Sequence, residues 1–407
     1  MEQNNLTDKI KWVGKVDDRK VPFHRLILEK GTTYNSYFID AKKPAVIDTV
    51  DIMFGKEYVD HLSKLTNLAE LEYIIINHVE PDHAGALPAL AAKAPKAVIV
   101  CTKLAEDELK KMFRLYNREF LIVKDGDQLS LGDVTLEFIE TPYLHTAETM
   151  VTYAKEDEIL FSCDIFSTHI ANIELFNDIA QQEYEEDFKV YYDLIMAPHR
   201  PYVRNMLKKI EALPIKMIAP SHGYILRENP QKYIEVYNEK SKLNINNKER
   251  KVVIAYATMT GNTGKIAALL SNQLSEAGIK VSVFHLKDAN LSEVADRMRE
   301  SDGILIGSST RYGDMVGNVE ALLKMLKAEE VAGKSAAVFG SYGWSGEAIA
   351  HIEDYLVQLG TKVVNQKFLI QNLGVDDAIF PLRVKFLAEE EKEHIEDAGR
   401  VFAELLQ

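Results

Sequence analysis

Four side chains able to bind a metal ion occur within six residues of this chain. They are His78, Glu80, Asp82 and His83, in the segment His78-Val-Glu80-Pro-Asp82-His83-Ala-Gly85. The apolar run Tyr73-Ile-Ile-Ile-Asn77 precedes them and predicts a buried strand, so the cluster occupies the loop at the end of that strand. Imidazole and carboxylate ligands without a thiolate favour iron, zinc or manganese.

Three later segments also place a metal-binding side chain shortly after an apolar run. These side chains are His145, Asp164 and His222. Seven ligands are too many for one ion but suit two ions bridged by a carboxylate. Asp164 is the candidate bridge, because no other ligand lies close to it in the sequence. His169 follows five residues later and is a candidate outer partner of a ligand.

A histidine that stands alone after a strand is often only a hydrogen-bonded loop residue, and for His222 this interpretation stays open. The histidines without such a context are interpreted as ordinary core or surface residues; they are His24, His61, His199, His285, His351 and His394.

A second set of residues, near the middle of the chain, is typical of a phosphate site. The set is Thr258, Met259, Thr260, Gly261, Asn262 and Thr263, between a predicted strand at 252–257 and a predicted helix at 263–277. Backbone N–H groups at a helix N-terminus attract an anion. The segment lacks the lysine of a triphosphate loop and the glycines of a dinucleotide loop, so it favours a mononucleotide, FMN. The alternative is a simple helix cap.

Two further predicted strand ends carry glycine-rich loops suited to a flat ring. Ligands in doubly wound folds bind at the carboxyl ends of the strands. The aromatic side chains here either flank the ring or pack on the surface. The candidate flavin residues are Ser308, Ser309, Thr310, Arg311, Tyr312 and Gly313 in the first loop, and Ser341, Tyr342, Gly343 and Trp344 in the second.

The elements that must position these residues fall into two parts. The first part has short apolar runs with helical patterns near 58–65, 104–115, 188–195 and 201–212, which predicts an α/β sandwich. The second alternates strands with helices and predicts a five-stranded doubly wound parallel sheet, including a strand at 362–370 and a last helix at 382–405. The polar stretch 240–251 separates them, so we expect domains at 1–248 and 249–407.

Composition excludes several classes of protein. The net charge of −14 disfavours nucleic-acid binding. Two cysteines disfavour a disulfide framework and fit a reducing cytoplasm. No run approaches the roughly 18 apolar residues that span a membrane, and the N-terminus lacks a signal-peptide pattern.

The metal-ligand pattern resembles the metallo-β-lactamase fold, whose hydrolytic members usually carry a histidine where Glu80 stands here. With Glu80, which adds negative charge and favours iron, the pattern resembles the flavodiiron proteins. The segments GTTYNSY at 31–37 and GSYGWSG at 340–346 extend the resemblance over the chain. It implies an αβ/βα sandwich followed by a flavodoxin-like domain.

The resemblance also implies how the irons are held. His78, Glu80 and His145 would bind one iron, Asp82, His83 and His222 the other, and Asp164 would bridge them. In some members a water displaces the histidine at the position of His83.

The resemblance further implies an oxidoreductase that passes electrons through FMN to the diiron centre. Dioxygen would be reduced to water, or nitric oxide to nitrous oxide. No pair of C-x-x-C motifs is present, so we expect an external donor such as rubredoxin or a reduced deazaflavin. The family's head-to-tail pairing predicts a homodimer or a dimer of dimers.

Three features depart from the family's pattern and bear on substrate preference. Thr146-Ala147-Glu148 replaces Trp-Pro-Asp, Leu226 stands where a tryptophan is common, and Cys163 precedes Asp164 where asparagine or another small residue is expected. Two other functions stay open: a zinc hydrolase with an accessory flavodoxin domain, and a non-catalytic oxygen sensor. Metal analysis tests the first, and multiple-turnover gas consumption tests the second.

Overall fold

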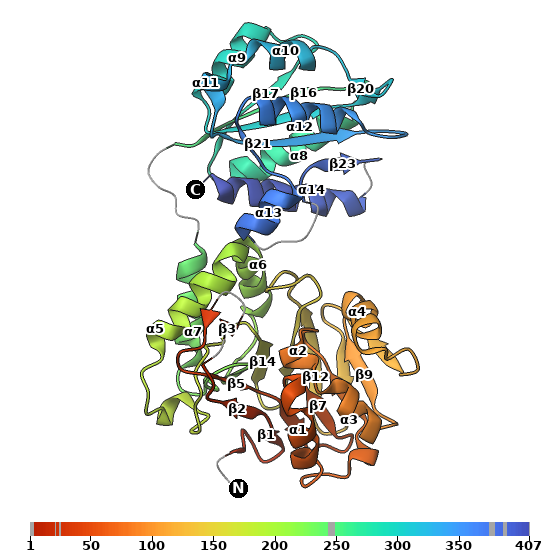
Figure 1. The fold of residues 1–407 in the computed structure, drawn as a ribbon, viewed down its shortest axis with the longest axis vertical. Helices are drawn as coiled ribbons and strands as arrows, with labels where there is room; N and C mark the ends of the chain where they lie inside the picture. The colour runs from red at the N-terminus through yellow and green to blue at the C-terminus, as the bar shows by residue number, and fades with distance from the viewer. Residues whose placement is uncertain are drawn as a thin grey trace. The chain divides into compact units, whose positions relative to one another are not determined.

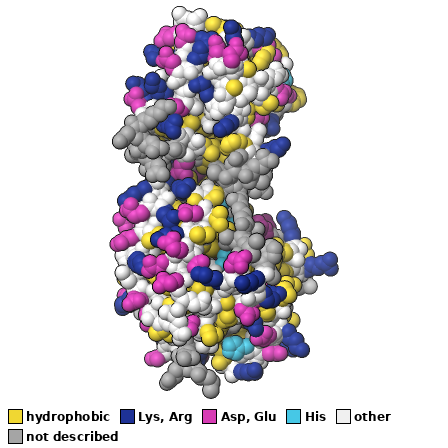
Figure 2. Space-filling view, turned by 60° about the vertical axis from the view of Figure 1, so that its left-hand side comes forward, with side chains coloured by type: hydrophobic (Ala, Val, Ile, Leu, Met, Phe, Trp, Pro, Cys, Tyr) yellow, Lys and Arg dark blue, Asp and Glu magenta, His cyan; other side chains and the backbone are white. Residues whose placement is uncertain are grey.

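The computed structural model describes residues 4–20, 22–23, 26–242, 249–373, 379–385 and 389–406. The chain forms two compact units, residues 1–242 and 243–407, drawn in Figure 1. The predicted boundary at 248/249 lies at the edge of residues 243–248, which are outside the described residues, and the assignment of two domains stays a prediction. In Figure 2, acidic and basic side chains are interspersed over the visible surface of both units.

The first unit contains two facing sheets. One has the order β1-β6-β7-β8-β9-β10 and the other β11-β12-β13-β14-β15. The strands of the first are β1 (Ile10–Trp12), β6 (Tyr37–Ile39), β7 (Ala45–Ile47), β8 (Tyr73–Ile75), β9 (Val98–Cys101) and β10 (Phe120–Ile122). Those of the second are β11 (Gln128–Ser130), β12 (Thr135–Glu140), β13 (Met150–Ala154), β14 (Ile159–Cys163) and β15 (Met217–Pro220). Two small ribbons pair β2 (Lys15–Asp17) with β5 (Thr32–Tyr34) and β3 (Pro22–Phe23) with β4 (Leu26–Ile27).

Hydrophobic cores among the described residues hold these layers together. The inner faces of the two sheets pack on each other through residues such as Ile47, Ile75, Phe138 and Phe161. Helices α1 (Gly55–Leu62), α3 (Leu87–Lys93) and α4 (Lys103–Phe113) cover the first sheet. Helices α5 (Glu185–Tyr191), α6 (Arg200–Ile210) and α7 (Pro230–Ser241) cover the second. The result is the predicted αβ/βα sandwich.

The segment that follows Gly31 links the two sheets beside the end of β15. Asn35 Nδ2 and the Tyr37 hydroxyl donate to the Pro220 carbonyl oxygen at 2.8 and 2.6 Å, and Asn35 N donates to the Ser221 carbonyl oxygen at 2.7 Å. All of these groups are buried. The start of the chain therefore fixes the loop that carries His222.

The second unit is the predicted doubly wound fold, with the parallel order β17-β16-β18-β21-β22. Its strands are β16 (Lys251–Ala257), β17 (Lys280–His285), β18 (Gly303–Ser308), β21 (Ser335–Ser341), β22 (Lys362–Val363) and β23 (Leu382–Val384), with a small hairpin of β19 (Thr310–Arg311) and β20 (Asp314–Met315). Its helices are α8 (Asn262–Glu276), α9 (Leu291–Glu300), α10 (Val319–Met325), α11 (Ala328–Val331), α12 (Ala348–Gln358), α13 (Gln366–Leu373) and α14 (Glu389–Leu405).

Two predicted elements near the end of the chain are wrong. The strand expected at 362–370 ends at Val363, because Asn365 caps α13 through a side-chain bond from Phe368 N at 3.0 Å. The helix expected from 382 begins at Glu389 instead. Residues 382–384 alternate between buried and exposed and pair in parallel with β21, as a strand does. The fifth strand position is thus shared by β22 and β23.

Within the described ranges, no helix combines the length and the apolar character that crossing a membrane requires.

Candidate metal centre

The seven predicted ligands lie in segments that follow strands of the first unit. His78 follows β8 by three residues, and Glu80 immediately precedes α2 (Pro81–Ala84), whose single turn carries Asp82 and His83. Pro81 suits this first helical position, because its missing N–H has no partner there in any helix. Asp164 directly follows β14, and His222 lies two residues after β15. Since β14 and β15 are parallel neighbours, these two side chains meet at one edge of the sheet.

The ligand atoms of the described residues form three overlapping clusters, and one of them, His78, His83 and Asp164, joins the other two. The His145 group consists of His78, Glu80 and His145, and the His222 group consists of Asp82, His83 and His222. In the first, Glu80 Oε2 lies 3.5 Å from the Nε2 atoms of His78 and His145. In the second, Asp82 Oδ2 lies 3.2 Å from the Nε2 atoms of His83 and His222. Ligand atoms about 2.1 Å from one ion, at tetrahedral or octahedral angles, are separated by about 3.0–3.4 Å, so each group has the spacing of a coordination shell.

Asp164 lies between the two groups and turns one oxygen to each. Its Oδ1 is 3.4 Å from the Nε2 atoms of His83 and His222. Its Oδ2 is 3.3 Å from His145 Nε2 and 3.8 Å from His78 Nε2. A carboxylate in this position is able to bridge two ions.

Burial supports a cation at this place. His78, His83, His222, Asp82 and Asp164 are at most 5% exposed. The Nε2 atoms of His78 and His83 are buried and make no hydrogen bond to any other described residue. Buried polar atoms of a folded protein normally have a partner, and a metal ion would supply it. Glu80 and His145 are more exposed, with 25% and 17% of their side chains open to solvent, so the centre opens on their side.

The charges of the ligand side chains also support a cation at this place. Burial raises the pKa of Asp164, but the surrounding histidines, His83 first, outweigh it and hold the pKa well below its usual range. Burial lowers the pKa of His145, but Asp164 and Glu80 raise it to about 9. The charge of Glu148 likewise outweighs burial and raises the pKa of His78. These shifts mean that the carboxylates favour positive charge at the histidine positions, which is the charge that a metal ion would supply.

Three ligand histidines use Nδ1 to contact a different kind of group. His78 Nδ1 lies 2.6 Å from Glu148 Oε1, a buried carboxylate. His222 Nδ1 lies 2.6 Å from the Thr33 carbonyl oxygen. His83 Nδ1 lies 3.8 Å from the Cys163 sulfur. When Nε2 binds a metal, Nδ1 is protonated, and its N–H group donates a hydrogen bond to these groups.

The sequence interpretation missed Glu148 and Thr33 as outer partners. For Glu148, the one indication in the sequence was that it belongs to the segment that departs from the family pattern. Thr33 acts through its backbone carbonyl, so its residue type gives no indication of this role. His169 lies where an outer partner would, with its ring centre 4.8 Å from that of His222 and its Nδ1 2.9 Å from Thr32 Oγ1.

The turn that carries Asp82 and His83 is tightly packed. A methyl group at Gly85 would lie 2.1 Å from the Pro81 carbonyl oxygen and 2.4 Å from the Ile52 nitrogen. On the other side of His78, Asp48 accepts from Asn77 N at 2.8 Å and from Asn77 Nδ2 at 3.1 Å. Close backbone packing therefore fixes the Gly85 end of the ligand cluster, and the Asp48 carboxylate fixes the Asn77 end.

Three of the predicted flavin residues, one from each predicted loop or the helix that follows it, come together in the second unit. Three loops, after β16, β18 and β21, meet where Thr263 Oγ1 lies 3.1 Å from Ser309 Oγ and 2.9 Å from Ser341 Oγ. Gly261, with φ of 87°, begins the turn into α8 and leaves open space where a side chain would stand. Tyr312 and Trp344 are 91% and 93% exposed, so both rings are open to a ligand.

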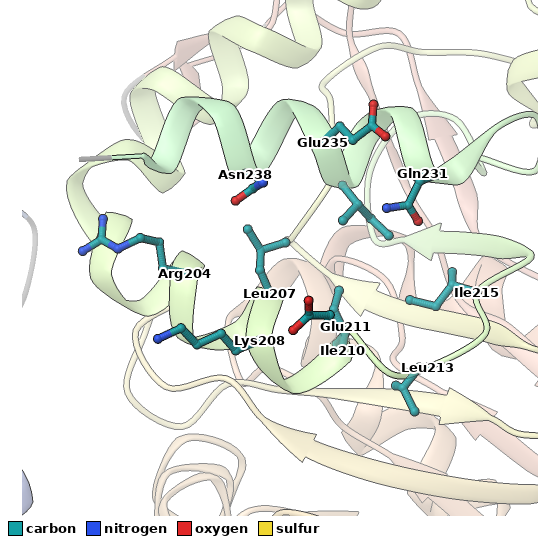
Figure 3. Close-up of a pocket in the computed structure, with 11 residues that line it drawn as sticks. Arg204, Leu207, Lys208, Ile210, Glu211, Leu213, Ile215, Gln231, Glu235 and Asn238 are labelled. Carbon is teal, nitrogen blue, oxygen red and sulfur yellow. The ribbon is translucent and has the colours of Figure 1, made fainter. Parts of the chain in front are cut away.

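A separate cavity of about 320 Å³ lies between α6 and α7 (Figure 3). Its lining includes apolar side chains such as Leu207 and Ile234 and charged ones such as Lys208 and Glu235, and it contains none of the predicted metal or flavin residues.

Two sequence families match the two units. The ODP family beta lactamase matches residues 32–223, and the flavodoxin family matches residues 254–396. The anaerobic nitric oxide reductase flavorubredoxin of Aeromonas hydrophila is 36% identical over 364 residues, which are 88% of this chain and 73% of that protein. An uncharacterised protein of Methanocaldococcus jannaschii is 35% identical over 89% of this chain and 92% of its own length.

Solved structures match over both units. The flavodiiron protein from Giardia intestinalis has a TM-score of 0.58 and 29% identity, covering 99% of this chain and 96% of that one. Rubredoxin:oxygen oxidoreductase from Desulfovibrio gigas has a TM-score of 0.56 and 27% identity, covering 99% and 98%.

Proposed function

Because this chain belongs to the flavodiiron protein family, we propose that it passes electrons from an external donor through FMN to a diiron centre and there reduces nitric oxide to nitrous oxide or dioxygen to water. The chain is an FMN- and iron-dependent oxidoreductase. We further propose that the His145 group holds one iron, the His222 group holds the other, and Asp164 bridges them.

The spacing of the ligand atoms is the observation that supports this assignment best. In each group one carboxylate oxygen lies 3.2–3.5 Å from two imidazole nitrogens, and both groups contact Asp164. Glu80 gives the His145 group a carboxylate where a hydrolytic zinc site has a third imidazole. That added negative charge stabilises a ferric ion more than a zinc ion.

When bound, the irons supply redox chemistry and a template for the small molecule. The chain's own residues keep the site dry and correctly charged. Asp82 and Asp164 offset the charge of the ions, and the buried side of the centre excludes water. Glu80 and His145 leave the opening through which a diatomic substrate enters.

The flavin residues in the second unit fit a mononucleotide. The hydroxyls of Thr263, Ser309 and Ser341 converge beneath the turn at Gly261, and the helix that begins there is long enough to attract a phosphate. Tyr312 and Trp344 are placed to flank the ring. We propose these loops as the FMN site.

A reduction assay tests the function. The purified protein with FMN and iron is reduced anaerobically, and consumption of nitric oxide and dioxygen is measured separately. We expect repeated turnover with at least one gas. Two bound zinc ions with hydrolytic turnover would support a hydrolase, and a single stoichiometric reaction with each gas would support a sensor.

We propose that the active unit is a head-to-tail homodimer or a dimer of such dimers, located in the cytoplasm. Exposed apolar side chains next to the Gly85 turn support this pairing, because a second chain would cover them. Ile52 and Met53 are 62% and 68% exposed there. Mixing a variant that cannot bind metal with one that cannot bind FMN tests the pairing. Recovery of activity in the mixed dimer is expected, and its absence in a proven mixed dimer would exclude transfer between chains.

A further inference from the structure

Glu148 contacts the metal centre through the His145 group. Its Oε1 accepts from His78 Nδ1 at 2.6 Å and from Val79 N at 3.2 Å. One oxygen thereby holds the His78 ring and the backbone that leads to Glu80, and both of these ligands belong to the His145 group. Thr102 Oγ1 donates to the Glu148 carbonyl oxygen at 2.9 Å, which fixes the backbone of Glu148 itself.

Glu148 is 2% exposed, so solvent screens its charge weakly. A histidine that donates its free N–H to a carboxylate becomes a better electron donor to the metal, and its ring orientation is fixed. The charge-assisted bond is also shorter and stronger than a neutral one. The His145 group therefore has an additional negative charge behind one of its ligands.

Through Nδ1, the histidines of the His222 group contact uncharged groups, whereas the buried carboxylate of Asp48 acts electrostatically on His83 and His78 of both groups. His222 donates to the neutral Thr33 carbonyl oxygen, and His83 faces the Cys163 sulfur at 3.8 Å. A thiol is a weak acceptor, so His83 gains little from this contact. The two groups match in ligand types but differ in the groups that their histidines contact through Nδ1.

We propose that Glu148 is a positioning residue that makes the His145 group the tighter of the two metal sites, so that metal ions fill the centre in a fixed order. The inference rests on the proposed diiron assignment. It goes beyond that assignment because it distinguishes the two ions and gives a role to a residue of the altered Thr146-Ala147-Glu148 segment.

The test is an anaerobic titration of the full-length, FMN-containing, metal-free protein with Co²⁺, followed by its visible absorption, and repeated with Fe²⁺. The wild type is expected to bind two ions in two distinguishable steps. Glu148→Gln keeps the shape but removes the charge, and it should weaken the first step by about 10- to 100-fold while leaving the second unchanged. Glu148→Asp keeps the charge and should recover part of the loss.

Two backgrounds assign the steps to the groups. In His222→Ala, only the His145 group is complete, and adding Glu148→Gln should weaken the remaining step. In His145→Ala, only the His222 group is complete, and the same addition should change nothing. Glu106→Gln is the matched control, because Glu106 is 9% exposed and its carboxylate binds Lys103 and Lys110 instead of a histidine.

Equal weakening of both steps by Glu148→Gln, or no weakening, would overturn the inference while the diiron assignment stands. A wild-type protein that binds neither ion would overturn the assignment itself. Circular dichroism of each variant identifies misfolding, and if Glu148→Gln is misfolded, the comparison of Glu148→Asp with wild type in the two backgrounds decides.

Discussion

Replacing Asp164 with asparagine should cost the protein both metal ions. Each oxygen of Asp164 faces a different ligand group, at 3.4 Å from two histidine nitrogens on one side and at 3.3 and 3.8 Å on the other. Asparagine keeps this shape. It removes the one negative charge that both ions share and replaces one oxygen with a nitrogen that does not bind a cation.

The magnitude follows from the number of charged ligands. Each ion has two carboxylates in the proposed arrangement, its own and Asp164, so the substitution halves the anionic ligands of both. Loss of an outer partner alone weakens metal binding by about 10- to 100-fold. Loss of an inner charged ligand should exceed this, giving at least about 100-fold for each ion, or about 2.7 kcal/mol.

The assay is iron content and Co²⁺ affinity of purified Asp164→Asn, compared with Asp82→Asn. Asp82 lies in the His222 group only, at 3.2 Å from two histidine nitrogens, so its substitution should remove one ion and spare the other. FMN content serves as the internal control, since the flavin residues lie in the other unit. Retention of one tightly bound ion in Asp164→Asn would refute the bridging role.

Three other perturbations have expected outcomes. Loading metal at pH 7 should release protons, because the pKa of His145 is raised to about 9 and its ring must lose a proton to bind the ion. The apparent metal affinity should therefore rise with pH up to about 9. Calorimetry in buffers of different ionisation enthalpy should show binding heats that depend on the buffer. Thr263→Val removes two buried hydroxyl contacts and should destabilise the second unit by about 1 kcal/mol and weaken FMN, seen as released flavin fluorescence, with iron content unchanged. Gly85→Ala puts a methyl group 2.1 Å from the Pro81 carbonyl oxygen and should destabilise the first unit by at least about 2 kcal/mol, with metal lost; a thermal midpoint equal to wild type would contradict this packing.

The sequence was sufficient to predict both folds, and the resemblance to the flavodiiron proteins implied a grouping of the seven ligands that stays a prediction. Strand periodicity is strong in buried runs such as residues 73–76, and the position of a ligand after a strand places it at a sheet edge. The close approach of Asp164 to His222 follows from the neighbouring parallel strands β14 and β15. Their role as ligands stays a prediction that the spacing supports.

What the sequence did not predict depends on contacts between distant parts of the chain. Residues 366–373 look apolar enough for a strand, yet the cap by Asn365 starts a helix. Residues 382–384 become a strand only because β21 offers an open edge. Glu148 lies 70 residues from His78, and Thr33 lies 189 residues from His222 and acts through its carbonyl. No local pattern encodes such partners.

The anchoring of the β15 loop by the start of the chain affects how the centre is assembled during synthesis. All residues of the His145 group, together with Glu148 and Asp164, have been synthesised once the chain reaches residue 164. His222 is synthesised much later, and its loop must then dock onto Asn35 and onto Thr33, which precedes His222 by 189 residues. Formation of the second metal site thus joins residues from opposite ends of the first unit, and it requires that the two sheets have already packed together.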